Sequence, residues 1–175
     1  MSQPAAVMAQ KTIVIGLGNP ILADDGVGIV TVERIAQQVE HPLVDFQWCS
    51  LAGFELLDLL VGYDKAIIVD SIKTGKYPVG QVMELEADSL MSTVRLASVH
   101  DINLATALEL GRMLALPVPA EITIYVVEVA DNTTFREGCC REVAAAVPLL
   151  EKAVINLLTE RYEDLSVKGG VAHHA

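Results

Sequence analysis

The stretch from Thr12 to Gly28 constrains the fold more than any other part of the chain. An apolar, β-branched run, Thr12–Leu17, leads into a glycine-rich turn, and two acids, Asp24 and Asp25, follow where a helical pattern begins. Glycines let the backbone turn sharply and let other groups approach it closely. A strand, a tight turn and a helix are therefore predicted in succession. A plain strand–turn–helix junction does not need the acidic pair, so this turn is the first candidate functional site.

Apolar runs alternate with helical periodicity along the rest of the chain. This order predicts an α/β fold, a three-layer α/β/α sandwich with a mostly parallel, twisted sheet of about five strands. Strands are expected at Thr12–Leu17, Leu43–Ser50, Lys65–Ser71, Gly80–Leu85 and Glu121–Val129. Helices are expected at Asp25–Val39, Gly53–Val61, Ile102–Leu116 and Cys139–Tyr162, and Pro148 is expected to kink or divide the last helix.

Two of the expected strands, Thr12–Leu17 and Lys65–Ser71, contain continuous apolar runs. A strand with this composition is typical of a parallel sheet that is covered on both faces. The segment Gln81–Leu85 instead alternates polar and apolar residues, which suits an edge strand and allows an antiparallel orientation. The sequence therefore predicts which strands are central and which strand lies at an edge.

The length of 175 residues predicts a single domain, expected over residues 11–165. Residues 1–10 are expected to form a flexible N-terminal extension and residues 166–175 a flexible tail. No apolar stretch is long enough to span a membrane, and no secretory signal pattern is present. Three cysteines without paired spacing fit a reducing compartment, so a cytoplasmic protein without a membrane partner is expected.

The net charge of −11 and the aromatic content of 5% oppose nucleic acid as a partner. An acidic surface repels phosphate backbones at long range, and base stacking needs more aromatic side chains than this.

Three polar residues are expected where the strands of the sheet end. Asp25 follows the first strand across the turn, Asp70 follows a buried apolar run, and His100 precedes the helix expected from Ile102. Ligands of open α/β sheets bind beyond the carboxyl ends of the strands. Carboxylate and imidazole groups are ligands for a divalent metal such as Ni²⁺ or Zn²⁺. We therefore expect these three side chains to share one edge.

Each of these residues also has a purely structural interpretation. Asp24 and Asp101 are candidate helix N-caps, the helix dipole favours Asp25, and His100 resembles an ordinary loop histidine. Asp70 is harder to explain in this way, because a carboxylate in a buried strand costs free energy unless it is paired or coordinated.

Several other kinds of site are not supported. The turn lacks the third glycine of a dinucleotide fingerprint, and the chain has no Walker A lysine, no Gly-x-Ser-x-Gly elbow and no His-Glu-x-x-His helix. Cys49, Cys139 or Cys140 could pair with His100 as a nucleophile, but free cysteines are more often small buried hydrophobes.

The combined motifs resemble those of the hydrogenase maturation endopeptidases, from about Thr12 to the final helix. The opening motif of that family is similar to Gly16-x-Gly18-Asn19 together with Asp24-Asp25-Gly26-x-Gly28. Further agreement in type and order is found at Gly53-x-Glu-Leu-Leu57, Ile67-Ile-Val-Asp70 and Ser98-x-His100-Asp101. One departure is Cys49-Ser50-Leu51-Ala52-Gly53, where many relatives carry Gly-Gly-Thr-x-Gly.

The resemblance implies a phosphorylase/hydrolase-like fold and a peptidase activity. Members of the family remove a C-terminal extension from the precursor of a nickel–iron hydrogenase large subunit after nickel has been inserted. The resemblance implies that Asp25, Asp70 and His100 engage the nickel of that precursor and carry the catalysis. Nickel is thus the expected metal, and the precursor is the expected partner.

Two other functions remain open from the sequence. A non-catalytic nickel-sensing or carrier module could use the same three residues. The segment Gly16-Leu-Gly-Asn-Pro20 also resembles the opening of peptidyl-tRNA hydrolases, but the Thr-Arg-His-Asn type segment of that family is missing. The acidic balance also opposes tRNA binding.

Overall fold

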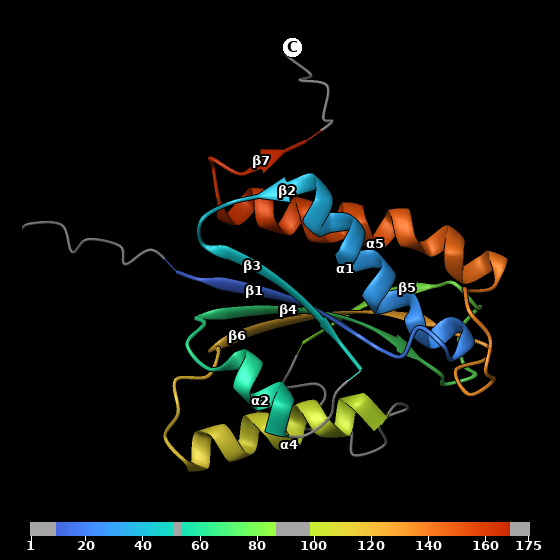
Figure 1. The fold of residues 1–175 in the computed structure, drawn as a ribbon, viewed down its shortest axis with the longest axis horizontal. Coiled ribbons are helices and arrows are strands. Elements are labelled where there is room, and N and C mark those ends of the chain that lie inside the picture. Colours follow the sequence, from blue (N-terminus) through green and yellow to red (C-terminus); the bar gives the residue numbers. More distant parts are fainter. Residues whose placement is uncertain (1–9, 51–53, 87–98, 169–175) are drawn as a thin grey trace, which may run out of the picture.

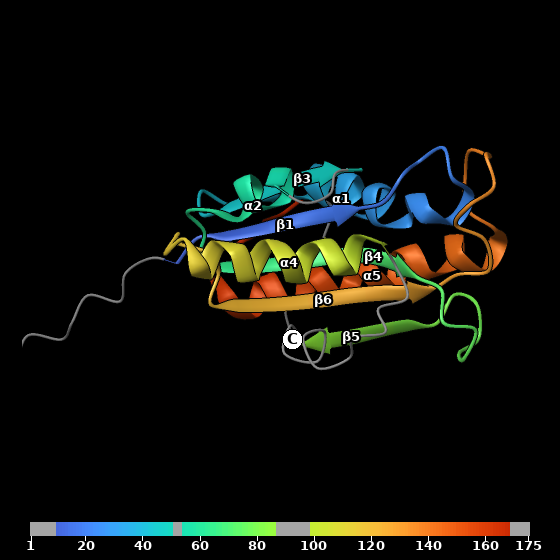
Figure 2. The same ribbon diagram turned by 90° about the horizontal axis from the view of Figure 1, so that it is seen from below.

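The computed structural model describes residues 10–50, 54–86 and 99–168. A central sheet of five strands lies between two layers of helices (Figure 1, Figure 2), and its strand order is β3-β1-β4-β6-β5. The strands of this sheet are β1 (Thr12–Leu17), β3 (Val44–Cys49), β4 (Lys65–Ile72), β5 (Val82–Glu86) and β6 (Glu121–Glu128). The helices are the 3₁₀ helix η1 (Ala23–Gly26), α1 (Val27–Gln38), α2 (Phe54–Leu60), α4 (Val99–Met113) and α5 (Arg141–Arg161).

Four strands of the sheet are parallel, and β5 pairs with β6 in the antiparallel direction. The central strand β1 is buried throughout, and β4 is buried after Lys65, as their continuous apolar composition predicts. The alternating segment forms β5, at the edge of the sheet. The prediction of a three-layer, mostly parallel α/β fold is confirmed.

The two faces of the sheet bury two separate sets of side chains. Alternation along β1 places Val14 in a cluster with α1 and α5, whereas Ile13 and Ile15 pack with α2 and α4. Figure 1 shows the same division, with α1 and α5 above the sheet and α2 and α4 below it. The helices therefore hold the central strands from both sides, as the sandwich requires.

Some element boundaries differ from those expected. Helix α5 runs as one element through Pro148, since its buried face is long enough to offset one missing backbone hydrogen bond. Helix α4 begins at Val99, so His100 lies within the helix and not in the loop before it. Ser166 and Val167, which were expected in a flexible tail, form β7 and pair with β2 (Val39–Glu40).

The parallel strands β3, β1, β4 and β6 all end at one side of the sheet, which we call the carboxyl edge. This edge lies on the right in Figure 1, where the loops after β1 and β6 extend beyond the sheet. Within the described residues, no helix is both long enough and apolar enough to cross a membrane.

Candidate active site

Asp25 lies in η1 at the carboxyl edge, and only 5% of its surface is exposed. Its Oδ2 accepts a 2.8 Å hydrogen bond from the backbone N–H of Asn19, and its Oδ1 accepts a 2.8 Å hydrogen bond from the hydroxyl of Ser71. Hydrogen bonds to a charged group are worth about 1.5–3 kcal/mol each. The carboxylate of Asp25 is therefore held in one orientation from two sides.

Two glycines of the opening motif explain how Asp25 reaches this position. Gly18 has a φ of +137°, and a Cβ there would lie 1.9 Å from the carbonyl oxygen of Asp25. A Cβ on Gly28 would lie 2.3 Å from the carbonyl oxygens of both Leu17 and Val69. The start of α1 can rest directly on β1 and β4 only because these side chains are missing. The glycine-rich turn therefore serves close backbone packing.

Asp70 lies in β4, two residues before the strand ends, and is 1% exposed. Its Oδ1 accepts a 2.7 Å hydrogen bond from the backbone N–H of Ser71. Since the hydroxyl of Ser71 binds Asp25, one residue connects the two acids. The structure thus brings Asp25 and Asp70 to the same place on the carboxyl edge.

Ser71 is not among the site residues predicted from the sequence. The sequence feature that could have indicated its role is a hydroxyl residue directly after the acid that follows an apolar run. In the structure Ser71 is fully buried. A buried hydroxyl needs a hydrogen-bond partner, and the acids brought together by the fold supply one.

His100 is the second residue of α4, whose first turn lies at the carboxyl edge in Figure 1. The backbone therefore brings this residue to the same edge as Asp25 and Asp70. The side chains of His100 and Asp101 lie outside the described ones, so contact between the imidazole and the two acids stays a prediction. Among the side chains that are described, no three or more His, Cys, Asp or Glu are arranged to hold a metal.

The N-cap interpretation of Asp24 is wrong. The residue that caps α1 is Gly26, and it makes no side-chain cap hydrogen bond. The fully buried carboxylate of Asp24 instead accepts a 2.7 Å hydrogen bond from the backbone N–H of Cys140 and a longer one, 3.4 Å, from that of Asp131. Asp24 therefore attaches the loop after β6 to the turn after β1. The N-cap interpretation of Asp101 is wrong as well, since α4 begins two residues before it.

The cysteines of the loop before α5 are poor candidates for a nucleophile. Burial, together with the nearby charge of Asp24, raises the pKa of the Cys139 thiol to about 11. Burial also raises the pKa of Cys140. The reactive form of cysteine is the thiolate, so both thiols are held in the unreactive form near neutral pH.

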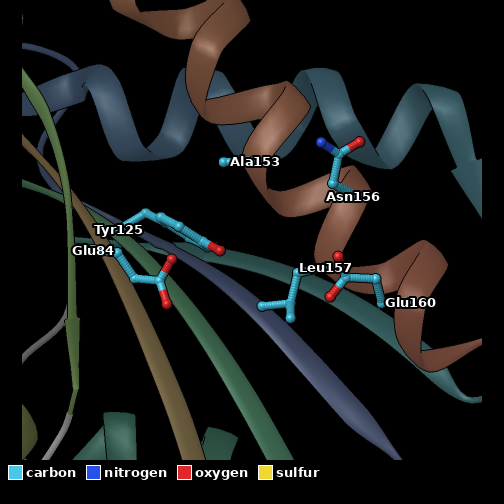
Figure 3. Close-up of a pocket in the computed structure, with 6 residues that line it drawn as sticks. All are labelled: Glu84, Tyr125, Ala153, Asn156, Leu157 and Glu160. Carbon is cyan, nitrogen blue, oxygen red and sulfur yellow. The ribbon is translucent and has the colours of Figure 1, made fainter.

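One hollow of about 320 Å³ lies between α5 and the strands β5 and β6 (Figure 3). It is lined by Glu84, Tyr125, Ala153, Asn156, Leu157 and Glu160. Burial, with a smaller effect from Glu84, raises the pKa of Tyr125 to about 12, so its hydroxyl stays protonated. No residue of the predicted site lines this hollow, which places it apart from the two buried acids.

The chain is similar in sequence to a known family of proteins. The sequence pattern of the family described as hydrogenase maturation protease (HycI) matches residues 29–157. The chain is 29% identical over 150 residues to the hydrogenase 2 maturation protease of Escherichia coli strain K12, covering 84% of this chain and 90% of that protein.

Solved structures show the same fold. The hydrogenase maturating endopeptidase HybD from Escherichia coli superposes with a TM-score of 0.79 at 25% identity, covering 90% of this chain and 96% of the other. The hydrogenase maturation protease HycI from Thermococcus kodakarensis superposes with a TM-score of 0.70 at 18% identity, covering 87% of this chain and 95% of the other. The family pattern covers more than half of the chain and includes Asp70, and the chain belongs to the hydrogenase maturation protease family.

Proposed function

We propose that this chain is an endopeptidase that removes the C-terminal extension of a nickel–iron hydrogenase large-subunit precursor after nickel insertion. The observation that carries the proposal is the connection of Asp25 to Asp70 through Ser71 at the carboxyl edge, in a member of this family. The position of His100 at the start of α4, on the same edge, supports its inclusion.

The chemistry of the donor set fits a divalent metal presented by the substrate. Each carboxylate oxygen of Asp25 accepts one hydrogen bond in the structure, and a carboxylate oxygen has two acceptor positions. The remaining positions, with Asp70 and the imidazole of His100, form the kind of mixed oxygen and nitrogen set that binds Ni²⁺. We propose that this set engages the nickel of the precursor.

Peptide hydrolysis needs an activated water, relief of charge on the carbonyl oxygen and a proton for the leaving amine. Nickel in the precursor can lower the pKa of a bound water and polarise the carbonyl. Either Asp25 or Asp70 is then available to accept a proton. This would make the enzyme an aspartate-dependent peptidase whose metal arrives with its substrate.

A gate on nickel follows from the same arrangement. A precursor without nickel would lose the contacts to all three residues, and with them the binding energy that positions the scissile bond.

The relative from Escherichia coli carries hydrogenase 2 in its name, so we propose a precursor of that class as the first substrate to assay. We also propose a cytoplasmic location, because three cysteines without paired spacing fit a reducing compartment.

The test is intact-mass analysis of the precursor, loaded with nickel or free of it, after incubation with this chain. We expect loss of a C-terminal peptide from the nickel-loaded sample alone. Asp70→Asn and His100→Ala should slow cleavage at least about 100-fold, since they remove a metal ligand or proton acceptor. Asp70→Asn keeps a carbonyl oxygen that can accept the hydrogen bond from Ser71.

Asp58→Asn is the matched control, because Asp58 is an exposed acid on α2. Cleavage by both site variants at the wild-type rate would overturn the assignment of the site. A stable complex with an unchanged precursor mass would instead indicate a non-catalytic binding module. Melting curves of each variant exclude unfolding as the cause of lost activity.

A further inference from the structure

Three exposed aromatic side chains lie on segments at the carboxyl edge. Trp48, one residue before the end of β3, is 45% exposed, and Tyr77, in the loop after β4, is 46% exposed. Phe135, in the loop after β6, is 81% exposed. Among the side chains that the structure describes, no other Trp, Tyr or Phe is exposed to this degree. Trp and Tyr dominate the centres of protein interfaces, and exposed apolar patches mark binding surfaces.

Phe135 is held next to a second exposed apolar side chain, Ile21, by backbone hydrogen bonds between two loops. The N–H of Arg136 donates to the carbonyl of Ile21 over 3.0 Å, and the N–H of Ala23 donates to the carbonyl of Arg136 over 2.7 Å. Figures 1 and 2 both show the loops after β1 and β6 side by side. The backbone next to Phe135 is therefore held in place by hydrogen bonds. Binding at this side chain costs little conformational entropy, because the loop is already ordered.

The loop that carries Tyr77 is also anchored, by the buried carboxylate of Glu128. Its Oε1 accepts hydrogen bonds from the backbone N–H groups of Thr74 and Gly75 at 2.8 and 2.7 Å. Its Oε2 accepts a 2.6 Å hydrogen bond from the hydroxyl of Thr74. A buried acid at the end of β6 thus shapes the loop next to the proposed active site.

Cations accompany the aromatic side chains, although the chain as a whole has a net charge of −11. Lys73 and Lys76 precede Tyr77 on its loop, and Arg136 and Arg141 follow Phe135. All four are exposed, and none forms a salt bridge with another described residue. Arg141 stands in the first turn of α5, where the helix dipole disfavours a cation. Exposed acids, Glu137 and Glu142, stand beside the two arginines, and Asp131 lies near Arg136. The loop with the two lysines contains no acid, so its charges are available to the carboxylates of a partner.

We propose that Ile21, Trp48, Tyr77 and Phe135, here called the apolar rim, dock the segment of the precursor that flanks its scissile bond. That segment is expected to carry an apolar side chain with acidic residues beside it, which complements the rim and its cations. The rim adjoins the proposed site at Ile21, which lies in the same turn as Asp25, and the N–H of Asp25 donates to the carbonyl of Leu22 over 3.0 Å. This inference rests on the proposed function.

The test compares wild type with Phe135→Ala, measuring both cleavage kinetics and the affinity for nickel-loaded precursor. We expect KM and Kd to rise roughly 10- to 30-fold, while kcat changes less than about 2-fold, because the rim binds and does not react. Met113→Ala is the matched control, since Met113 is 78% exposed at the far end of α4 and should leave both constants unchanged.

A second pair of variants tests the charge. The double variant Lys73→Glu and Lys76→Glu should weaken binding at low salt, and the difference should shrink as salt screens the charges. Lys152→Glu, an exposed cation of α5 outside the rim, is the control and should bind as wild type does.

The outcomes separate the two proposals. Binding and cleavage of the precursor by wild type, with Phe135→Ala unchanged in KM and Kd, would overturn the rim and leave the proposed function intact. Binding without cleavage by wild type would overturn the peptidase proposal, and the Kd of Phe135→Ala would still decide for or against the rim. If wild type neither binds nor cleaves the nickel-loaded precursor, both proposals fall together.

Discussion

The hydroxyl of Ser71 donates a 2.8 Å hydrogen bond to Oδ1 of Asp25, while its backbone N–H donates to Asp70 over 2.7 Å. One small residue thereby sets the position of two acids that lie 45 residues apart in the sequence. Asp25 receives its second hydrogen bond from the turn after β1, and Asp70 belongs to β4. The proposed site is therefore built across two neighbouring strands of the sheet.

We predict that Ser71→Ala lowers kcat for precursor cleavage roughly 10-fold with little change in KM, because Asp25 loses one of the two bonds that orient it. Steady-state kinetics on nickel-loaded precursor measure both constants. Thr159→Ala is the control, since that exposed hydroxyl only bonds the carbonyl of Ile155. A wild-type kcat for Ser71→Ala would show that the hydroxyl does not position the acid.

Replacing Asp24 should loosen the loop that carries Phe135. We expect Asp24→Asn to lower the free energy of unfolding by about 1–3 kcal/mol, because an amide NH₂ would face a backbone N–H in a buried place. Urea denaturation measures the loss, and hydrogen exchange at the amide of Cys140, which donates to Asp24, should become faster. Asp58→Asn, on the exposed face of α2, should change stability by less than about 0.5 kcal/mol. Unchanged protection at Cys140 would argue against this attachment.

The close approach of α1 to the sheet predicts strong intolerance at Gly28. Gly28→Ala should cost about 3 kcal/mol or more, or prevent folding, since the added Cβ meets two backbone carbonyls at 2.3 Å. Gly62→Ala is the comparison, because Gly62 has a φ of +91° and open space around it. In Gly62→Ala the left-handed backbone conformation is the only source of strain, and it should lower the free energy of unfolding by about 1–2 kcal/mol. Equal losses in thermal melts of the two variants would refute the packing argument.

Cys139 should react slowly with alkylating reagents at neutral pH. With the pKa of its thiol raised to about 11, its labelling rate at pH 8 should be far below that of an exposed cysteine and should rise with pH. The pKa of a thiol in the unfolded chain is about 8.5. The free energy of unfolding therefore falls as the pH rises from that value toward the higher pKa of Cys139 in the folded protein. Mass analysis of timed iodoacetamide reactions gives the rate.

The raised pKa of the Cys139 thiol also makes this residue a poor catalytic nucleophile. Cys139→Ala should cleave precursor at the wild-type rate, because the thiol takes no part in the proposed chemistry. Loss of cleavage in a folded Cys139→Ala protein would reopen the cysteine nucleophile.

The sequence alone determined the layers of the fold and the order of its elements. β1 was predicted to the residue, and β4 to within one residue, because strands covered on both faces consist of continuous apolar runs. The edge strand β5 was predicted because one of its faces meets solvent and its residues alternate. Asp25 and Asp70 were selected because they follow these strands. Each of these signals is encoded by neighbours along the chain.

Only the tertiary structure decided how the polar groups are paired. Asp24 carries the sequence signature of an N-cap, yet its partner is the N–H of Cys140, 116 residues away. Ser71 and Glu128 likewise form hydrogen bonds with segments that come together only when the sheet has formed. The pairing of β7 with β2 has the same origin. Periodicity reports which face of an element is buried, whereas the partner of a buried polar group depends on distant segments that the fold brings together.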